Sequence, residues 1–401
     1  MRAEFRATRR VLRNAVRSRL ARRAVARELA RRAPVPAGHF VVAVHFPDFP
    51  VNAYQVRQWY RPLEIVADEL PVVVISRYAS TTRLLLAECP VPVVHAPRIA
   101  DVETVLTEHP VRAVLYVNQN VRNFSVLRYR DPVHVFCSHG ESEKDYMASG
   151  QLKAYDRTFI AGPAAAARLR VLHEFDVAAR TVQIGRPQID HLPTGPIVHD
   201  GRQTVLYAPT WEGDRPSMTY GSVATHGPAL VDAILADPRY RLVFRPHPRT
   251  GTSDHGAAAA LHRIRRTVER ANRAGGKHLV DTTTDFGWQL GVCDVCVTDV
   301  SAVAYDWLAT GKPLVLTEPA DPAAVTDGAR LPTVVPGLPA QDARDVVPLL
   351  DRALSDPLPA EQTALIAEFF GDVSPGASTR RFVQALRQVI NEREALLQHS
   401  R

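Results

Sequence analysis

The sequence predicts an α/β fold made of two doubly wound domains that face each other across a cleft. Three observations lead to this prediction. Short apolar runs alternate with helical stretches from residue 39 onward, and a Pro- and Gly-rich join at 191–201 separates two such halves. The length of 401 residues, at roughly 150 residues per domain, allows two domains with a core each. Apolar runs without polar alternation are typical of parallel strands that helices cover on both faces.

The predicted strands are the short apolar runs of each half. In the first half they are Phe40–Phe46, Val72–Ser76, Ala113–Asn118, Val133–Ser138 and Arg157–Ala161. In the second half they are Thr204–Pro209, Tyr240–Arg245, His278–Asp281, Val292–Thr298 and Pro313–Thr317. The chain then divides into a basic helix at 1–36, an N-terminal domain at 37–195, a C-terminal domain at 196–375 and a last helix at 376–401.

Residues 2–32 carry most of the positive charge of the chain. Twelve arginines against two glutamates make this segment +10, whereas the whole chain is +7, so the rest is mildly acidic. The segment lacks Gly and Pro, and Leu12, Val16 and Leu20 follow one another at helical spacing. We expect a basic amphipathic helix on an anionic membrane surface. A solvated arm and a nucleic-acid-binding arm remain alternatives, although the acidic body argues against a nucleic-acid partner.

The sequence lacks the signatures of several common classes of protein. There is no apolar signal segment at the start and no apolar run long enough to span a bilayer, so we expect a cytoplasmic protein. Walker A, GxGxxG, HExxH, GxSxG and DxD motifs are absent, and no metal site is expected. The pair Cys293 and Cys296 lies in a predicted buried strand without a second ligand pair, which favours core thiols.

Polar segments follow four of the predicted strands, at the edge where doubly wound folds bind ligands. His139 comes directly after Val133–Ser138, where a neutral imidazole can take a proton from an attacking hydroxyl. Pro209 ends the strand Thr204–Pro209, so Thr210 and Trp211 lie at the same edge. A structural histidine and a strand-ending turn with a packed tryptophan are the alternatives at these two places.

The other two segments have the chemistry of phosphate binding. Arg245 and His247, which alternate with Pro246 and Pro248, lie where a strand ends and can hydrogen-bond phosphate oxygens. Asp299 or Ser301 can cap a helix whose free N–H groups then face the cleft. Rigid Pro-His-Pro packing and a cap without a ligand are the alternatives. The common placement of all four segments at strand ends favours one site.

The order of these motifs resembles the CDP-glycerol glycerophosphotransferase family, the teichoic-acid primases and polymerases. The resemblance covers about residues 130–320. It is carried by His139-Gly140-Glu141-Ser142-Glu143-Lys144, Gly185-Arg186-Pro187-Gln188-Ile189-Asp190, Tyr207-Ala208-Pro209-Thr210, His247-Pro248 and Thr298-Asp299-Val300-Ser301-Ala302. Compared with the family pattern, Gln188 replaces an arginine and Ala302 replaces a second serine.

The resemblance implies a glycosyltransferase-B fold of two Rossmann-like domains in an enzyme that is peripheral to the inner face of the cell membrane. Its reaction would move glycerol phosphate, or a related alditol phosphate, from a CDP-activated donor to a hydroxyl of a membrane-bound glycolipid or teichoic-acid-like polymer. Neither a cofactor nor a metal is implied. The N-terminal domain would hold the acceptor and the C-terminal domain the nucleotide donor.

The resemblance also implies roles for individual residues. His139 would be the general base, and His247 with Arg245 would act on the donor pyrophosphate. The remaining donor-side residues would be Thr210, Thr298, Asp299, Ser301 and Ala302. The acceptor-side residues would be Gly140, Glu141, Ser142 and Lys144. Departures from the family pattern leave the transferred group open, so a nucleotide-sugar glycosyltransferase and a non-catalytic envelope-assembly scaffold remain alternatives.

Overall fold

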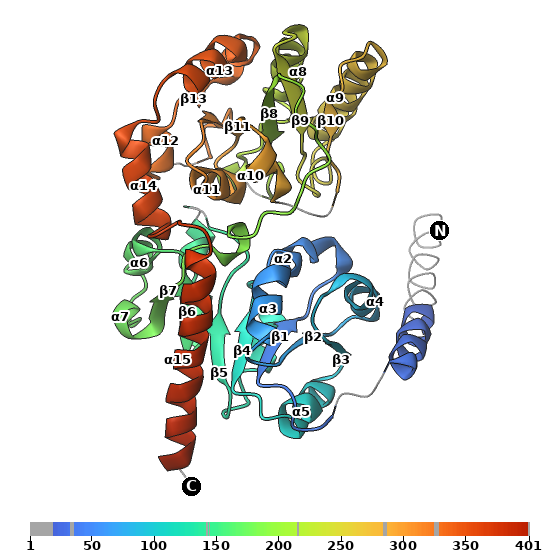
Figure 1. Ribbon diagram of the computed structural model, residues 1–401, viewed down its shortest axis with the longest axis vertical. Helices are drawn as coiled ribbons and strands as arrows, with labels where there is room; N and C mark the ends of the chain where they lie inside the picture. The colour runs from blue at the N-terminus through green and yellow to red at the C-terminus, as the bar shows by residue number, and fades with distance from the viewer. Residues whose placement is uncertain are drawn as a thin grey trace, which may run out of the picture.

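The computed structural model describes residues 19–32, 36–141, 143, 145–214, 216–283, 287–324 and 329–399. Two parallel sheets, each flanked by helices, form two domains that lie one above the other in Figure 1. The prediction of two α/β domains is therefore confirmed.

The N-terminal domain contains a seven-stranded parallel sheet in the order β3-β2-β1-β4-β5-β6-β7. Its strands are β1 (Val42–Phe46), β2 (Val72–Ser76), β3 (Val93–His95), β4 (Ala113–Tyr116), β5 (Val133–Phe136), β6 (Arg157–Ile160) and β7 (Thr181–Gln183). Its α-helices are α2 (Tyr54–Arg57), α3 (Tyr60–Ala67), α4 (Ala79–Glu88), α5 (Ile99–Glu108), α6 (Pro163–Leu169) and α7 (Val177–Arg180). Its 3₁₀ helices are η1 (Pro50–Asn52), η2 (Val121–Ser125), η3 (Asp145–Ala148), η4 (Gly150–Ala154) and η5 (Pro187–Ile189).

The C-terminal domain contains a six-stranded parallel sheet in the order β10-β9-β8-β11-β12-β13. Its strands are β8 (Gln203–Ala208), β9 (Tyr240–Phe244), β10 (Leu279–Val280), β11 (Val295–Thr298), β12 (Leu314–Thr317) and β13 (Gly337–Leu338). Its helices are η6 (Pro216–Met218), α8 (Gly227–Ala236), α9 (His255–Arg273), α10 (Trp288–Val292), α11 (Ala302–Leu308), α12 (Leu331–Val334), η7 (Ala340–Asp345) and α13 (Val346–Ser355). Two further helices, α14 (Ala360–Phe370) and α15 (Ala377–His399), follow.

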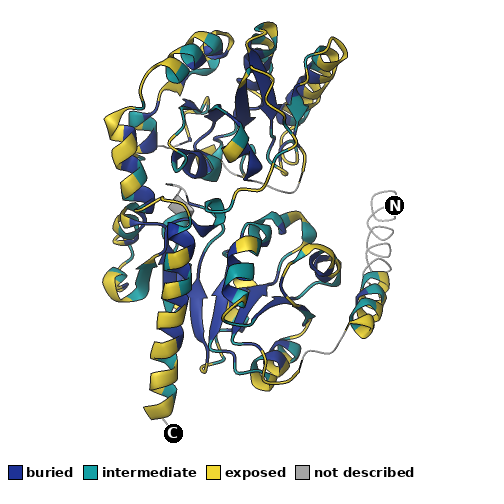
Figure 2. Ribbon diagram, viewed as in Figure 1, coloured by how far each residue is buried: buried dark blue, intermediate teal, exposed yellow. Residues whose placement is uncertain are grey.

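All ten predicted strands are present, and three short strands were missed. The central strands β1, β2, β4 and β5 are buried along their whole length, as continuous apolar runs require (Figure 2). The missed strands β3, β7 and β13 lie at sheet edges and contain two or three residues each. Such short segments have too few apolar residues to stand out in a sequence.

The last two helices join the domains. The segment 376–401 was expected as a separate helix, but α15 returns to the N-terminal domain, where Phe382 and Leu386 enter the core (Figure 1). The ring of Phe382 lies 5.1 Å from that of Trp59. Helix α14 packs on α6 so closely that a Cβ on Gly162 would lie 2.5 Å from the carbonyl oxygen of Phe369. Only glycine therefore fits at this contact.

Part of the predicted basic helix is seen packed on the N-terminal domain. Residues 19–31 are helical, and residues 2–18 of the predicted 2–32 helix lie outside the described residues. Val25 is 1% exposed in the domain core, and Leu29 packs against it, whereas Leu20 is 59% exposed. Val25 and Leu29 thus face the protein, whereas Leu20 faces the solvent. No helix in the described ranges is both long and apolar enough to cross a bilayer.

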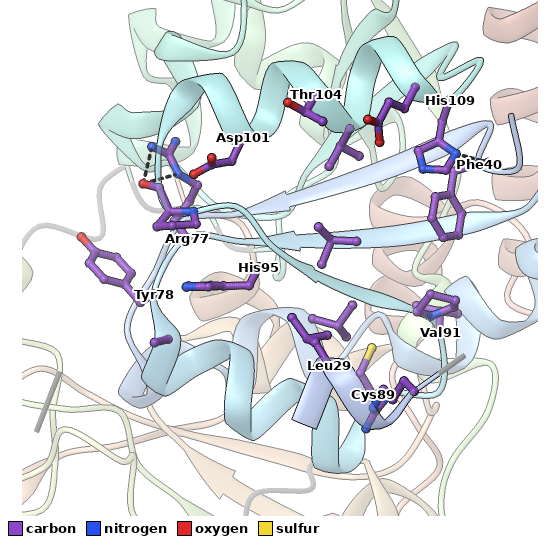
Figure 3. A pocket seen from close by; sticks show the side chains of 18 of the residues that line it. Leu29, Phe40, Arg77, Tyr78, Cys89, Val91, His95, Asp101, Thr104 and His109 are labelled. Atoms are coloured by element: carbon purple, nitrogen blue, oxygen red, sulfur yellow. Dashed lines mark hydrogen bonds between the residues drawn. The ribbon is translucent and has the colours of Figure 1, made fainter. Parts of the chain in front are cut away.

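A large cavity of about 1280 Å³ lies at the outer edge of the N-terminal sheet. It is lined by Arg22 and Leu29 of the basic helix, by His95 of β3 and by Asp101 of α5 (Figure 3). Neither His139 nor His247 lines this cavity. The two predicted catalytic residues therefore lie outside this cavity, at the ends of strands.

Candidate active site

His139 follows β5, and a backbone carbonyl orients its ring. Nδ1 of His139 lies 3.2 Å from the carbonyl oxygen of Val117. A carbonyl can only accept, so Nδ1 carries the proton and Nε2 keeps its lone pair. The pKa of His139 is lowered to about 4, mainly by burial; the hydrogen bond to Val117 acts in the opposite direction, and the nearby Arg186 charge adds to the lowering. The imidazole is therefore neutral at pH 7, with an acceptor nitrogen at Nε2.

The backbone around His139 is held in an unusual conformation. Ser138 has a φ of +57°, which is uncommon for a residue with a side chain. Trp59 Nε1–H donates to the carbonyl oxygen of Ser138 at 2.7 Å, and Arg186 donates to that of His139 at 2.9 Å. Since a positive φ persists only where surrounding contacts enforce it, these two bonds fix the position of the imidazole.

Arg186 also connects the two domains. Its Nε donates to Asp306 of α11 at 2.6 Å, and the side chains of this ion pair are only 5% and 4% exposed. A further bond joins Arg186 to Gln58 at 3.1 Å. Sequence reasoning used the motif around Arg186 only as a family resemblance, and nothing in the sequence pairs it with Asp306.

The predicted acceptor-side residues have different surroundings. A Cβ on Gly140 would lie 3.1 Å from that of Ala302, so the loop after β5 touches the start of α11 in the other domain. Glu141 is 4% exposed and forms a salt bridge with Arg168. The Glu141 carboxylate thus binds Arg168 in the protein interior, and its contact with an acceptor stays a prediction. Ser142 and Lys144 lie outside the described residues.

Glu143, which the sequence analysis did not select, links the same loop to the C-terminal domain. Its carboxylate accepts from the Tyr305 hydroxyl at 2.7 Å. It also accepts from the backbone N–H groups of Arg330 and Leu331 at the start of α12. The loop after β5 is therefore anchored in both domains.

His247 follows β9 and has the opposite tautomer to His139. The backbone N–H of Arg249 donates to Nδ1 of His247 at 3.1 Å, so the proton of the neutral ring is on Nε2. The Arg249 guanidinium lies 3.6 Å above the Trp211 ring, which stacks with His247 at 6.5 Å. The site thus has a proton acceptor on one imidazole and a proton donor on the other.

Two carboxylates hold the donor-side loops. Glu212 accepts from the backbone N–H groups of Gly251 and Ser253, which fixes the loop after His247. Asp281, at the end of β10, forms a salt bridge with Arg245. Burial alone would raise the pKa of Asp281, but the Arg245 charge and its hydrogen bonds hold it below the usual value. Arg245 is therefore positioned by Asp281.

Thr298 is the last residue of β11, and Asp299 follows it. Both are fully buried, and Asp299 accepts from the backbone N–H groups of Thr210 and Ser222 and from the Thr317 hydroxyl. Burial raises the pKa of Asp299 to about 6. The Thr298 hydroxyl donates to the carbonyl oxygen of Ala208. These two side chains therefore hold strand ends together, and their contact with the donor stays a prediction.

Thr210 and Ser301, two further predicted donor-side residues, are also buried but retain a small exposed fraction. Thr210 is buried and its N–H is bound to Asp299. Ser301 is the N-cap of α11, and its side chain forms no capping hydrogen bond. Helix α11 has only seven residues, so the dipole at its N-terminus is smaller than that of a long helix.

Tyr54, on α2, brings the two histidines together. Its ring centroid lies 5.8 Å from that of His139 and 6.0 Å from that of His247, edge to face in both cases. The two predicted catalytic residues, more than 100 positions apart, thus meet at one aromatic ring between the domains. The sequence offers only a weak signal for Tyr54, namely its place after the first predicted strand.

The arrangement is suited to the transfer of a phosphoryl group. A base nitrogen can activate a hydroxyl, while an N–H donor on the other side can bind a phosphate oxygen. Among the described residues no cluster of three or more His, Cys, Asp or Glu side chains could hold a metal ion. Cys293 and Cys296 are buried free thiols, as predicted.

Residues 141–386 match the family described as CDP-Glycerol:Poly(glycerophosphate) glycerophosphotransferase. No curated protein matches the chain in sequence.

Solved structures resemble the whole chain in fold. The wall teichoic acid polymerase TagF, in a variant soaked with CDPG, has 13% identity and a TM-score of 0.59 over 97% of this chain and 98% of its own. A putative UDP-N-acetylglucosamine 2-epimerase from Listeria monocytogenes has 15% identity and a TM-score of 0.58 over 88% of this chain and 98% of its own. A glycosyltransferase from Rickettsia africae has 9% identity and a TM-score of 0.52 over the same shares. The fold is the two-domain glycosyltransferase-B type.

Proposed function

The chain belongs to the CDP-glycerol:poly(glycerophosphate) glycerophosphotransferase family and is an enzyme of that type; we propose that it transfers glycerol phosphate, or a related alditol phosphate, to a hydroxyl of a membrane-bound glycolipid or teichoic-acid-like polymer. One observation carries this proposal. His139 and His247 come from different domains, contact the same Tyr54 ring and have complementary tautomers. A proton acceptor and a proton donor on opposite sides of one junction support a transfer between two bound substrates.

In the proposed reaction, the acceptor hydroxyl gives its proton to Nε2 of His139 as its oxygen attacks the β-phosphorus of the donor. The bond from that phosphorus to the bridging oxygen breaks, and CMP leaves. Nε2–H of His247 donates to an oxygen of the transferred phosphate, and the positive charges of Arg245 and Arg249 lie in the same loop. The negative donor raises the pKa of His139 from about 4, which makes it a stronger base once the donor is bound.

Nucleotide release tests the substrate class. The enzyme is incubated with CDP-glycerol, CDP-ribitol or UDP-glucose, each with a lipid-linked oligo(glycerol phosphate) as acceptor, and released CMP or UDP is measured. We expect CMP from a CDP-alditol. Release of UDP alone would favour a nucleotide-sugar glycosyltransferase, and no release from any donor would favour a scaffold.

We propose further that the arginine-rich arm holds the enzyme on the inner face of the cell membrane. The +10 charge of residues 2–32 and the exposed Leu20 support this proposal. Because Val25 and Leu29 pack on the protein, the membrane contact falls to residues 2–18 and Leu20. Deletion of residues 2–18 should abolish sedimentation with anionic liposomes, and wild-type binding should weaken with salt. Binding that survives the deletion would refute this role.

A further inference from the structure

Tyr54 occupies the meeting point of the two histidines, although no step of the proposed reaction uses it. The plane of the Tyr54 ring makes an angle of 82° with the imidazole plane of His139 and of 79° with that of His247. Burial raises the pKa of the Tyr54 phenol, so the side chain is neutral at pH 7. Its hydroxyl accepts a long hydrogen bond, 3.4 Å, from Gln55.

The backbone next to Tyr54 is firmly attached to the loop of His139. The Arg186 guanidinium donates both to the Gln58 side-chain oxygen and to the His139 carbonyl oxygen. Trp59, which is fully buried, donates to the carbonyl oxygen of Ser138. By contrast, ring contacts and one long hydrogen bond hold the Tyr54 side chain. Its ring can therefore rotate about the side-chain bonds while the backbone stays in place.

The proposed reaction must take place against this ring. The acceptor oxygen has to lie about 3 Å from Nε2 of His139, and the donor phosphate has to reach Nε2–H of His247 at a similar distance. The reacting atoms thus lie between two imidazoles that both contact Tyr54. Water is smaller than any acceptor, and His139 would activate a water molecule as readily as an alcohol.

We propose that Tyr54 excludes water from the junction of His139 and His247, so that the enzyme transfers the alditol phosphate instead of hydrolysing its donor. This inference rests on the proposed function. In the hydrolysis that Tyr54 prevents, a water oxygen bonds to the β-phosphorus, its proton passes to His139, and the bond to the bridging oxygen breaks. The products are CMP and the free alditol phosphate. An acceptor hydroxyl displaces the Tyr54 ring and binds at the position from which the ring excludes water.

The test compares CMP release from CDP-glycerol with and without lipid-linked oligo(glycerol phosphate). In Tyr54→Ala the ratio of acceptor-independent to acceptor-dependent release should rise at least tenfold, and Tyr54→Leu should raise it less. Tyr54→Phe keeps the ring and should stay within twofold of wild type. Tyr78→Ala is the matched control, because Tyr78 stacks on Phe49 in the same domain and contacts neither histidine.

The outcomes separate this inference from the proposed function. If Tyr54→Ala and Tyr54→Leu lower both rates by one factor and leave the ratio unchanged, Tyr54 is merely structural. A ratio in Tyr54→Phe as high as in Tyr54→Ala would also overturn water exclusion by the ring. If wild-type protein releases no CMP even with acceptor, the proposed function fails, and the inference fails with it. Thermal unfolding of each variant confirms that it is folded.

Discussion

Arg186→Ala should destabilise the protein far more than the loss of an ordinary surface ion pair. Arg186 and Asp306 form a pair that is almost completely buried between the domains. Removal of one partner from a buried pair costs about 3–5 kcal/mol, because the remaining charge has no compensation. The carbonyl oxygen of His139 and the amide oxygen of Gln58 lose a donor as well, so we expect the upper part of this range.

Arg61→Ala provides the matched control. Arg61 and Glu64 form a pair of nearly the same length, 2.5 Å against 2.6 Å, but their side chains are 57% and 46% exposed. Such a surface pair contributes about 0–1 kcal/mol. Urea unfolding followed by tryptophan fluorescence and by far-UV circular dichroism gives both values, with coincident curves as the check for one transition. An equal loss of stability in the two variants would refute the argument from burial.

A double variant separates stability from positioning. Arg186→Met with Asp306→Leu removes both charges, and such apolar replacements of buried pairs are often neutral or stabilising. Most of the lost stability should therefore return. The His139 carbonyl oxygen still lacks its donor, and a displacement of about 1 Å can cost on the order of 100-fold in rate. Full recovery of kcat along with stability would show that Arg186 does not position His139.

The remaining predictions concern the histidines, Asp299 and metal ions. His139→Ala should lower kcat by about 10²–10⁴-fold while calorimetric binding of CDP-glycerol changes little, because the base acts on the acceptor; loss of binding alone would contradict that role. Since the pKa of His139 in the free enzyme is about 4, kcat/KM should show no acid-side fall from this group between pH 5 and 7.5, and a fall centred near 6.5 would argue for an unperturbed histidine. The folded-state pKa of Asp299, about 6, is above its ordinary 3.8, so its stabilising contribution is complete below pH 3.8 and is lost as pH rises through 6. The free energy of unfolding of Asp299→Asn minus that of wild type should consequently rise between pH 4.5 and 8, by about 2–3 kcal/mol for a shift of roughly two pKa units. A difference that does not change with pH would contradict a buried charge at Asp299. EDTA should leave the rate of CMP release unchanged, whereas inhibition that Mg²⁺ reverses would show a metal requirement.

The candidate site could be predicted in part, because its two histidines follow strands. The sequence places His139 and His247 after apolar runs, and carboxyl ends of parallel strands lie at one edge of a sheet. Tyr54, Arg186 and Glu143 could not be found in this way. Each acts through a partner more than 80 positions away in the chain, and no local pattern announces such a pairing.

The sequence does not show that some of the predicted site residues are buried. Asp299 and Thr298 stand in a motif at a strand end, which suggested contact with the donor. A strand end has two sides, however, and both side chains turn inward to bind neighbouring strand ends. Glu141 follows His139 in the chain but turns to Arg168. Motif position therefore predicts where the candidate site lies, whereas the tertiary structure decides which side chains are buried.

What the sequence determined by itself is the fold class, the two sheets with ten of their strands, the family and the positions of His139 and His247 after strands. These follow from local properties, namely apolar runs, helical spacing and short motifs. Tertiary structure alone decided the edge strands, the return of α15 to the first domain, the buried pair of Arg186 with Asp306 and the place of Tyr54. The physical reason is that packing and charge pairing between distant segments depend on where the chain brings them together, which no local pattern of residues specifies.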